Sequence, residues 1–149
     1  MQVCVRAGSN MQNAPRLRGY PQGYIFIAMA TIDISEKTFN DTITGNDIVL
    51  VDFWAAWCGP CRMFAPTFSK ASDNHTDVVF AKVDTEAEPG LSAAARITSI
   101  PTLMAFREGI LVFSQPGAMN ATGLEQLITG IKELDMEEVR AKMTAAPAS

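Results

Sequence analysis

The 149-residue chain has few cysteines, a single histidine and no long apolar run. Three cysteines are too few for a scaffold held together by disulfides. A structural zinc site usually takes four Cys or His ligands, and residues 31–149 offer only Cys58, Cys61 and His75. No apolar run approaches the ~20 residues that cross a bilayer. The sequence therefore argues against a disulfide scaffold, a zinc module and a membrane-spanning helix.

Basic residues are scarce in most of the chain. The net charge is −4, yet residues 1–30 carry three arginines and no acid, which leaves nine bases and sixteen acids in the remainder. A body with a net charge of −7 argues against nucleic acid as a partner. Glu86 and Glu88 are interpreted as part of a solvated acidic surface.

The first thirty residues differ from the rest and are excluded from the predicted fold. Residues 1–23 show neither helical nor strand periodicity, and we expect a disordered arm in which Cys4 is a free thiol without a role. Residues 24–30, "YIFIAMA", end in the small-x-small triplet of an export signal, but seven residues are the minimum for such a core. We favour Met29 as the true start, with an upstream extension before it.

From Thr31 the pattern predicts strands alternating with helices. Expected strands are 31–34, 47–54, 77–84, 101–106 and 110–115, and helices are expected after Ser35, after the cysteines, from Pro89 and over 124–134. This order predicts an α/β fold with a mixed sheet of about five strands and about four flanking helices. Three strands are of the parallel type, and the last two form an antiparallel hairpin with Gly109 in its turn. We assign 31–134 to the domain and 135–149 to a helical extension and a frayed tail.

The stretch "VDFWAAWCGPCRMFAP" at 51–66 places two cysteines between a buried strand and a helix. Cys58 falls at the helix N-terminus, where free backbone N–H groups and the helix dipole favour a thiolate. Cys61 lies one turn further on the core side, which suits a resolving thiol. A purely structural disulfide closing so short a loop would restrict the unfolded chain very little. The pair is therefore interpreted as a redox pair in preference to a zinc ligand or a structural disulfide.

Asp52 lies within the buried strand, on the same side as Leu50 and Trp54. A buried carboxylate is costly unless it is paired or protonated, so burial should raise its pKa. The alternative is an aspartate satisfied by backbone donors.

Five motifs, "VDFWAAWCGPC", "AKVD", "SIPT", "REG" and "QPGA", follow one another in the order found in thioredoxins. Over residues 31–134 the chain resembles the thioredoxin family. The resemblance implies that Asp52 transfers protons for Cys61, with Lys82 as a nearby cation. It also implies that Pro101 is a cis-proline beside the cysteines, leaving the backbone of Ile100 free to pair with a target segment. A flat docking surface is implied at Trp57, Gly59, Pro60, Ile100, Pro101 and Gly117.

The same resemblance implies a monomeric protein-disulfide reductase of the cytoplasm that takes part in electron transport and cell redox homeostasis. The Cys58–Cys61 disulfide is its redox centre, with no bound cofactor and no metal. NADPH and flavin belong to the partner, a thioredoxin reductase, and the other partners are target proteins with disulfides. Two departures are Arg62, where lysine is common, and Ser99, where glycine is frequent; the second is expected to narrow partner choice. An exported reductase and a thiol-independent binding subunit are the alternatives.

Overall fold

The structure is a computed structural model that describes residues 30–145. The predictions for the N-terminal arm, for Cys4, for the export signal or start at Met29, and for most of the frayed tail lie outside these residues. Within 30–145 no helix combines the length and the apolar character needed to cross a membrane.

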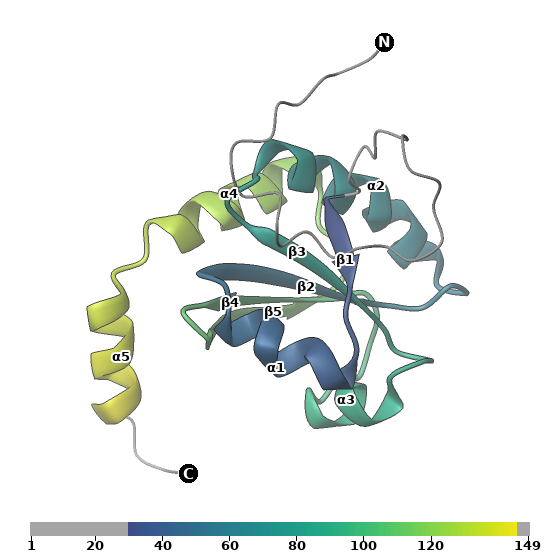
Figure 1. The fold of residues 1–149 in the computed structure, drawn as a ribbon. Helices are drawn as coiled ribbons and strands as arrows, with labels where there is room; N and C mark the ends of the chain where they lie inside the picture. Colours follow the sequence, from purple (N-terminus) through teal and green to yellow (C-terminus); the bar gives the residue numbers. More distant parts are fainter. Residues whose placement is uncertain (1–29, 146–149) are drawn as a thin grey trace, which may run out of the picture.

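A five-stranded sheet forms the centre of the molecule (Figure 1). Its strands lie in the order β1, β3, β2, β4, β5. Their bounds are Thr31–Asp33 (β1), Ile48–Trp54 (β2), Val79–Asp84 (β3), Thr102–Arg107 (β4) and Ile110–Pro116 (β5). β1, β3 and β2 run parallel, whereas β4 pairs antiparallel with β2 and β5 antiparallel with β4. The predicted mixed sheet is confirmed.

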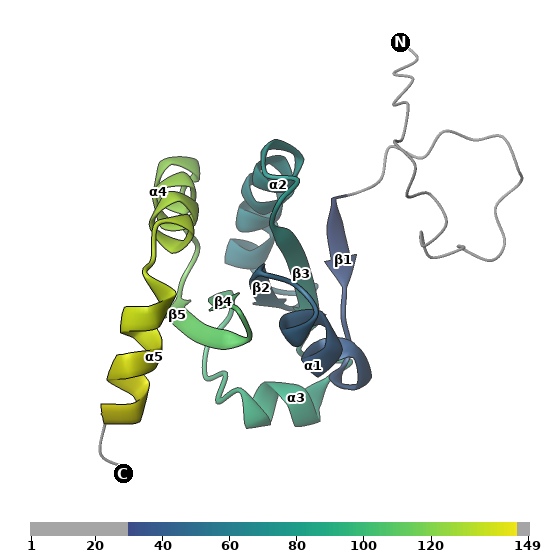
Figure 2. The same cartoon turned by 60° about the vertical axis from the view of Figure 1, so that its left-hand side comes forward.

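Helices cover both faces of the sheet, as Figure 2 shows. Their bounds are Glu36–Thr44 (α1), Gly59–Asn74 (α2), Pro89–Ala94 (α3), Ala121–Lys132 (α4) and Met136–Ala145 (α5). Helices α2 and α4 cover one face, and α1 and α3 cover the other. The described residues hold five helices where about four were expected, because the closing apolar stripe ends at α4 and a separate helix follows it.

Strand β2 is buried on both faces, which explains its continuous apolar sequence. Leu50 points into a core built with Phe64 and Phe68 of α2 and Leu124 and Ile128 of α4. The alternate residues of β2 contribute to a second core on the α1 and α3 side; these are Val49, Val51 and Phe53. Two packed faces hold β2 rigidly, and this strand leads directly into the cysteine turn.

The hairpin between β4 and β5 turns at Glu108 and Gly109, which have φ values of 51° and 78°. Two successive residues with positive φ are typical of the two-residue turns that match strand twist, and glycine adopts this conformation without steric cost. The predicted turn at Gly109 is confirmed.

The side chain of Arg107, at the end of β4, binds the C-terminal end of α4. The Nη1 atom of Arg107 donates hydrogen bonds to the carbonyl oxygens of Ile131, Lys132 and Leu134, at 2.6, 2.9 and 2.9 Å. Ile131 and Lys132 are the last two residues of α4, and Leu134 follows the helix. Carbonyl groups at a helix end lack the regular i→i+4 partner, so the guanidinium supplies donors where they are needed. Helix α5 then begins with the buried Met136, and its Arg140 forms an ion pair with Glu108 in the hairpin turn.

Candidate functional site

The two predicted thiols lie at the start of α2, directly after β2. Cys58 is the N-cap residue of α2, and Gly59 and Pro60 form its first turn, where proline's missing N–H costs no hydrogen bond. The backbone N–H of Cys61 donates to Sγ of Cys58 at 3.2 Å. The two residues form a disulfide, with their Cα atoms 5.2 Å apart. The exposed fractions of Cys58 and Cys61 are only 4% and 3%, so both residues are nearly covered by their surroundings.

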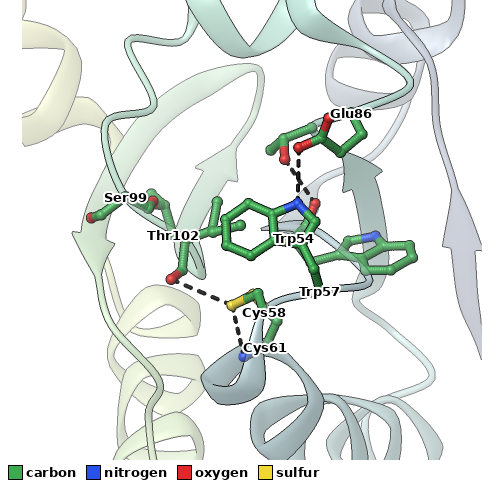
Figure 3. The surroundings of a disulfide bond; sticks show 9 residues. Trp54, Trp57, Cys58, Cys61, Glu86, Ser99 and Thr102 are labelled. Atoms are coloured by element: carbon green, nitrogen blue, oxygen red, sulfur yellow. Dashed lines mark hydrogen bonds between the residues drawn. A yellow bond between two sulfur atoms is a disulfide. The ribbon is translucent and has the colours of Figure 1, made fainter.

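A second segment faces the disulfide from the loop before β4 (Figure 3). The peptide bond between Ile100 and Pro101 is cis. The carbonyl oxygen of Ile100 lies 3.6 Å from Sγ of Cys58. Because a disulfide sulfur carries no proton, this is a contact in the oxidised protein, and it can become a hydrogen bond only when Cys58 is a thiol. The carbonyl of Pro101 accepts a hydrogen bond from the N–H of Gly117 at 2.8 Å, which joins the end of β5 to this segment.

The six residues expected to form a docking surface differ in exposure. Four are exposed, namely Trp57, Gly59, Pro60 and Gly117, and Ile100 is half-buried. Pro101, the sixth of these residues, is buried. It is joined to Ile100 by the cis peptide bond.

Asp52 is completely buried in β2, with an exposed fraction of 0%. Among residues 30–145 neither of its carboxyl oxygens has a hydrogen-bond partner. The interpretation that backbone donors satisfy Asp52 is therefore wrong. Burial raises the pKa of Asp52 to about 7, and the positive charge of Lys82 acts against that rise. A carboxyl group with this pKa is available both as an acid and as a base near neutral pH.

Lys82 connects Asp52 to the surroundings of the cysteines. It stands opposite Asp52 in the parallel pairing of β3 with β2. Its Nζ atom lies 4.8 Å from the ring centroid of Trp54, a cation–π arrangement. Trp54 in turn packs against the small cluster that contains Cys58 and Cys61. The aspartate, the lysine and the disulfide are thus parts of one packed region.

One contact at the site has no counterpart in the sequence analysis. The Nε1–H of Trp57 donates a hydrogen bond to Oε1 of Glu86 at 2.9 Å. Glu86 was interpreted as a solvated surface residue, and it is indeed exposed, but it also holds the indole next to Cys58. The two residues are 29 positions apart, so no local pattern links them.

Comparison with known proteins identifies the family. The family model described as thioredoxin matches residues 30–130. The chain belongs to the thioredoxin family. Among the relatives of this thioredoxin is a Streptomyces coelicolor protein named putative thioredoxin 2, which is 50% identical over 111 residues, covering 74% of this chain and 83% of the relative. The thioredoxin of Mycobacterium bovis is 40% identical over 97 residues, covering 64% of this chain and 84% of the relative.

Solved structures with the same fold include other thioredoxins. A mutant thioredoxin from Halobacterium salinarum has a TM-score of 0.66 and 32% identity, and the match covers 70% of this chain and 93% of that one. The Plasmodium falciparum thioredoxin has a TM-score of 0.62 and 38% identity, over 67% and 97% of the two chains. These matches confirm the predicted thioredoxin fold.

Membership of the family and the disulfide together establish the chemistry in general form. The protein is a thiol–disulfide oxidoreductase, and its redox-active group is the disulfide between Cys58 and Cys61. Among residues 30–145 the Cys, His, Asp and Glu side chains form no group of three or more that could hold a metal ion.

Proposed function

We propose that this thioredoxin reduces disulfides in target proteins, with Cys58 as the attacking thiol and Cys61 as the resolving thiol. The Cys58 thiolate attacks one sulfur of a target disulfide, so that the target's S–S bond breaks and its other sulfur leaves as a thiolate. Cys61, as a thiolate, then attacks Sγ of Cys58 and releases the second target sulfur. The target gains two electrons and, after protonation, two thiols, while Cys58 and Cys61 become the disulfide.

One observation carries this assignment. The N–H of Cys61 points at the sulfur of Cys58 from the first turn of α2. A backbone donor and the positive end of the helix dipole at one sulfur stabilise its anionic form. This asymmetry between the two thiols favours Cys58 as the thiolate that attacks the target.

Asp52 supplies the proton transfer in this proposal. Resolution by Cys61 needs a base to remove the thiol proton, and the buried carboxyl with its pKa of about 7 suits that role. Lys82, opposite Asp52, limits how far burial raises the pKa and so keeps part of the carboxyl ionised at neutral pH. Asp52 is thus the base, and Lys82 acts through Asp52 by lowering the pKa of its carboxyl group.

Target docking falls to the exposed residues around the disulfide. Trp57, Gly59, Pro60 and Gly117 are exposed, and none of the four has an ionisable side chain. The backbone of Ile100 can pair with an extended target segment, because the following proline has no N–H and Ile100 lies outside the five strands found in residues 30–145. Such pairing contacts the backbone of the target and not its side chains, and it therefore suits targets of many different sequences.

The partners and the setting follow from the same proposal. We expect a thioredoxin reductase, carrying flavin and oxidising NADPH, to restore the dithiol, and we expect the thioredoxin to act as a monomer. Residues 31–134 form the working domain. We place the protein in the cytoplasm, where it carries electrons to targets and maintains redox homeostasis. Sequencing the N-terminus of the protein from its cells tests the location, since cleavage after Ala30 would indicate export instead.

Reduction of insulin disulfides tests the function directly. The reduced thioredoxin should precipitate the insulin B chain when NADPH and a thioredoxin reductase supply electrons, and also when dithiothreitol supplies them. The double variant Cys58→Ser/Cys61→Ser is the control and should be inactive with both donors. Failure of the wild-type protein with both donors would contradict the reductase function; failure with the enzyme alone would contradict only the choice of reductase.

A further inference from the structure

Trp57 is unusually exposed for a tryptophan, although it lies directly beside the redox-active disulfide. Its exposed fraction is 67%, and it directly precedes Cys58. An indole with so little packing around it can populate several side-chain rotamers. Each alternative rotamer would change the shape of the surface that a target must meet. A contact that selects one rotamer therefore matters for docking.

The hydrogen bond to Glu86 is such a contact. The indole Nε1–H of Trp57 donates to Oε1 of Glu86 at 2.9 Å, and Figure 3 shows the carboxyl group beside the ring. An ionised carboxylate is a stronger acceptor than a neutral group. Among residues 30–145, Glu86 takes part in no ion pair that would compete with this bond.

Glu86 is itself held in place by the loop that follows β3. The backbone N–H groups of Glu86 and Ala87 donate to Oδ1 of Asp84, at 2.9 and 3.4 Å. The backbone N–H and the hydroxyl of Thr85 both donate to the carbonyl oxygen of Trp54, at 2.9 and 3.0 Å. The loop is thus fixed to the last residue of β2, the strand that leads into the cysteine turn. The loop therefore holds the backbone of Glu86, whose carboxylate accepts the hydrogen bond, close to the indole of Trp57.

We propose that Glu86 is a positioning residue that orients Trp57 for docking of protein disulfides. The inference rests on the proposed function, because it assigns a determinant of target affinity to the same site. Ordering the indole before a target arrives lowers the entropy lost on docking, and the ordering of one such side chain corresponds to a factor of about two to ten in affinity. The effect depends on how much of the indole the target covers. The affinity for large protein targets should depend on this ordering, and the affinity for small disulfides should depend on it much less.

Steady-state kinetics of two variants separates this role from a general effect. In Glu86→Ala the indole loses its acceptor, so we expect KM for insulin to rise about two- to tenfold with kcat little changed. The KM for a small disulfide, bis(2-hydroxyethyl) disulfide, should rise much less. In Glu86→Gln the side-chain amide oxygen can still accept the hydrogen bond, and KM for insulin should stay within about twofold of the wild-type value. Glu133→Ala removes the same charge from an exposed position at the end of α4 and should change neither value.

The indole resonance provides a second readout that does not depend on activity. The Nε1–H signal of Trp57, assigned with a Trp57→Phe variant, should shift in Glu86→Ala and remain near its wild-type position in Glu86→Gln. A wild-type KM for insulin in Glu86→Ala would overturn the proposal, as would equal losses in the Ala and Gln variants, which would point to charge instead. If wild-type protein does not reduce insulin, the proposed function fails, while the indole signal still decides whether Glu86 holds Trp57.

Discussion

Asp52 and Lys82 stand opposite each other on the parallel strands β2 and β3, and the lysine charge offsets only part of the cost of burying the carboxyl group. Burial is the larger influence and raises the pKa of Asp52 to about 7. The carboxyl therefore changes its charge in the pH range in which thiols react. The charge state of Asp52 therefore affects both the free energy of unfolding and the proton transfer proposed for the site.

The first consequence concerns stability. The pKa of Asp52 is higher in the folded protein than its ordinary value of 3.8, so between these limits the folded state binds more protons than the unfolded state. The stability linked to this proton is present below the ordinary pKa and is lost as the pH rises through about 7. Between pH 4 and 8, the free energy of unfolding should fall by about 4 kcal/mol more in the wild type than in Asp52→Asn. Urea unfolding of both oxidised proteins at several pH values measures this, and parallel curves would contradict it.

The second consequence concerns the rate. If Asp52 is the base for Cys61, the rate of insulin reduction in the wild type should show an inflection near the carboxyl pKa of about 7. In Asp52→Asn the rate should be lower and this inflection absent, while the far-ultraviolet circular dichroism stays unchanged. Rates measured from pH 6 to 9 provide the comparison. Identical profiles for the two proteins would remove Asp52 from the mechanism.

Lys82 offers a separate test of the electrostatics. Its charge lowers the pKa of Asp52, so Lys82→Met should raise that pKa above about 7. Lys82→Arg keeps the charge and should leave the titration close to that of the wild type. The side-chain carboxyl carbon of Asp52, followed by NMR as a function of pH, reports the titration. A midpoint that is the same in Lys82→Met and in the wild type would contradict the role given to the lysine.

Helix α5 tests the extent of the working domain. It is anchored by the buried Met136 and by an ion pair between Arg140 and Glu108 at 2.5 Å. A chain that ends at Leu134 should lose about 2 kcal/mol of stability, the worth of one buried methionine side chain, and should keep its insulin-reducing activity. Arg140→Ala removes only a largely exposed ion pair and should cost less than about 1 kcal/mol. Loss of activity in a folded truncated chain would extend the working domain into α5.

The sheet could be predicted from the sequence because each strand carries a strong local pattern. Strand β2 reads as a continuous apolar run, and it is buried against helices on both faces. The hairpin follows from Gly109, since a turn with positive φ selects this residue. Helix α5 was harder to predict as a separate element, because most of its residues are exposed and only Met136 of its sequence is buried.

The local parts of the site could also be predicted, whereas its long-range contacts could not. The spacing of Cys58 and Cys61 on either side of a helix start predicts the N-cap geometry that the structure shows. The missing partners of Asp52 and the bond from Trp57 to Glu86 depend on where separate segments meet. The burial of Pro101 also depends on how segments distant in the sequence pack together, and the local sequence around it does not reveal this burial.

The most direct test of the account is a comparison of chains with one thiol at the site. In a chain with Cys4→Ser and Cys61→Ser only Cys58 remains, and a chain with Cys4→Ser and Cys58→Ser keeps only Cys61. Each is mixed with insulin, and the adducts that dithiothreitol can release are quantified by mass spectrometry. We predict a mixed disulfide between insulin and Cys58 in the first chain and little or none in the second. Equal trapping by both thiols, or more trapping by Cys61, would contradict the assignment of Cys58 as the attacking thiol.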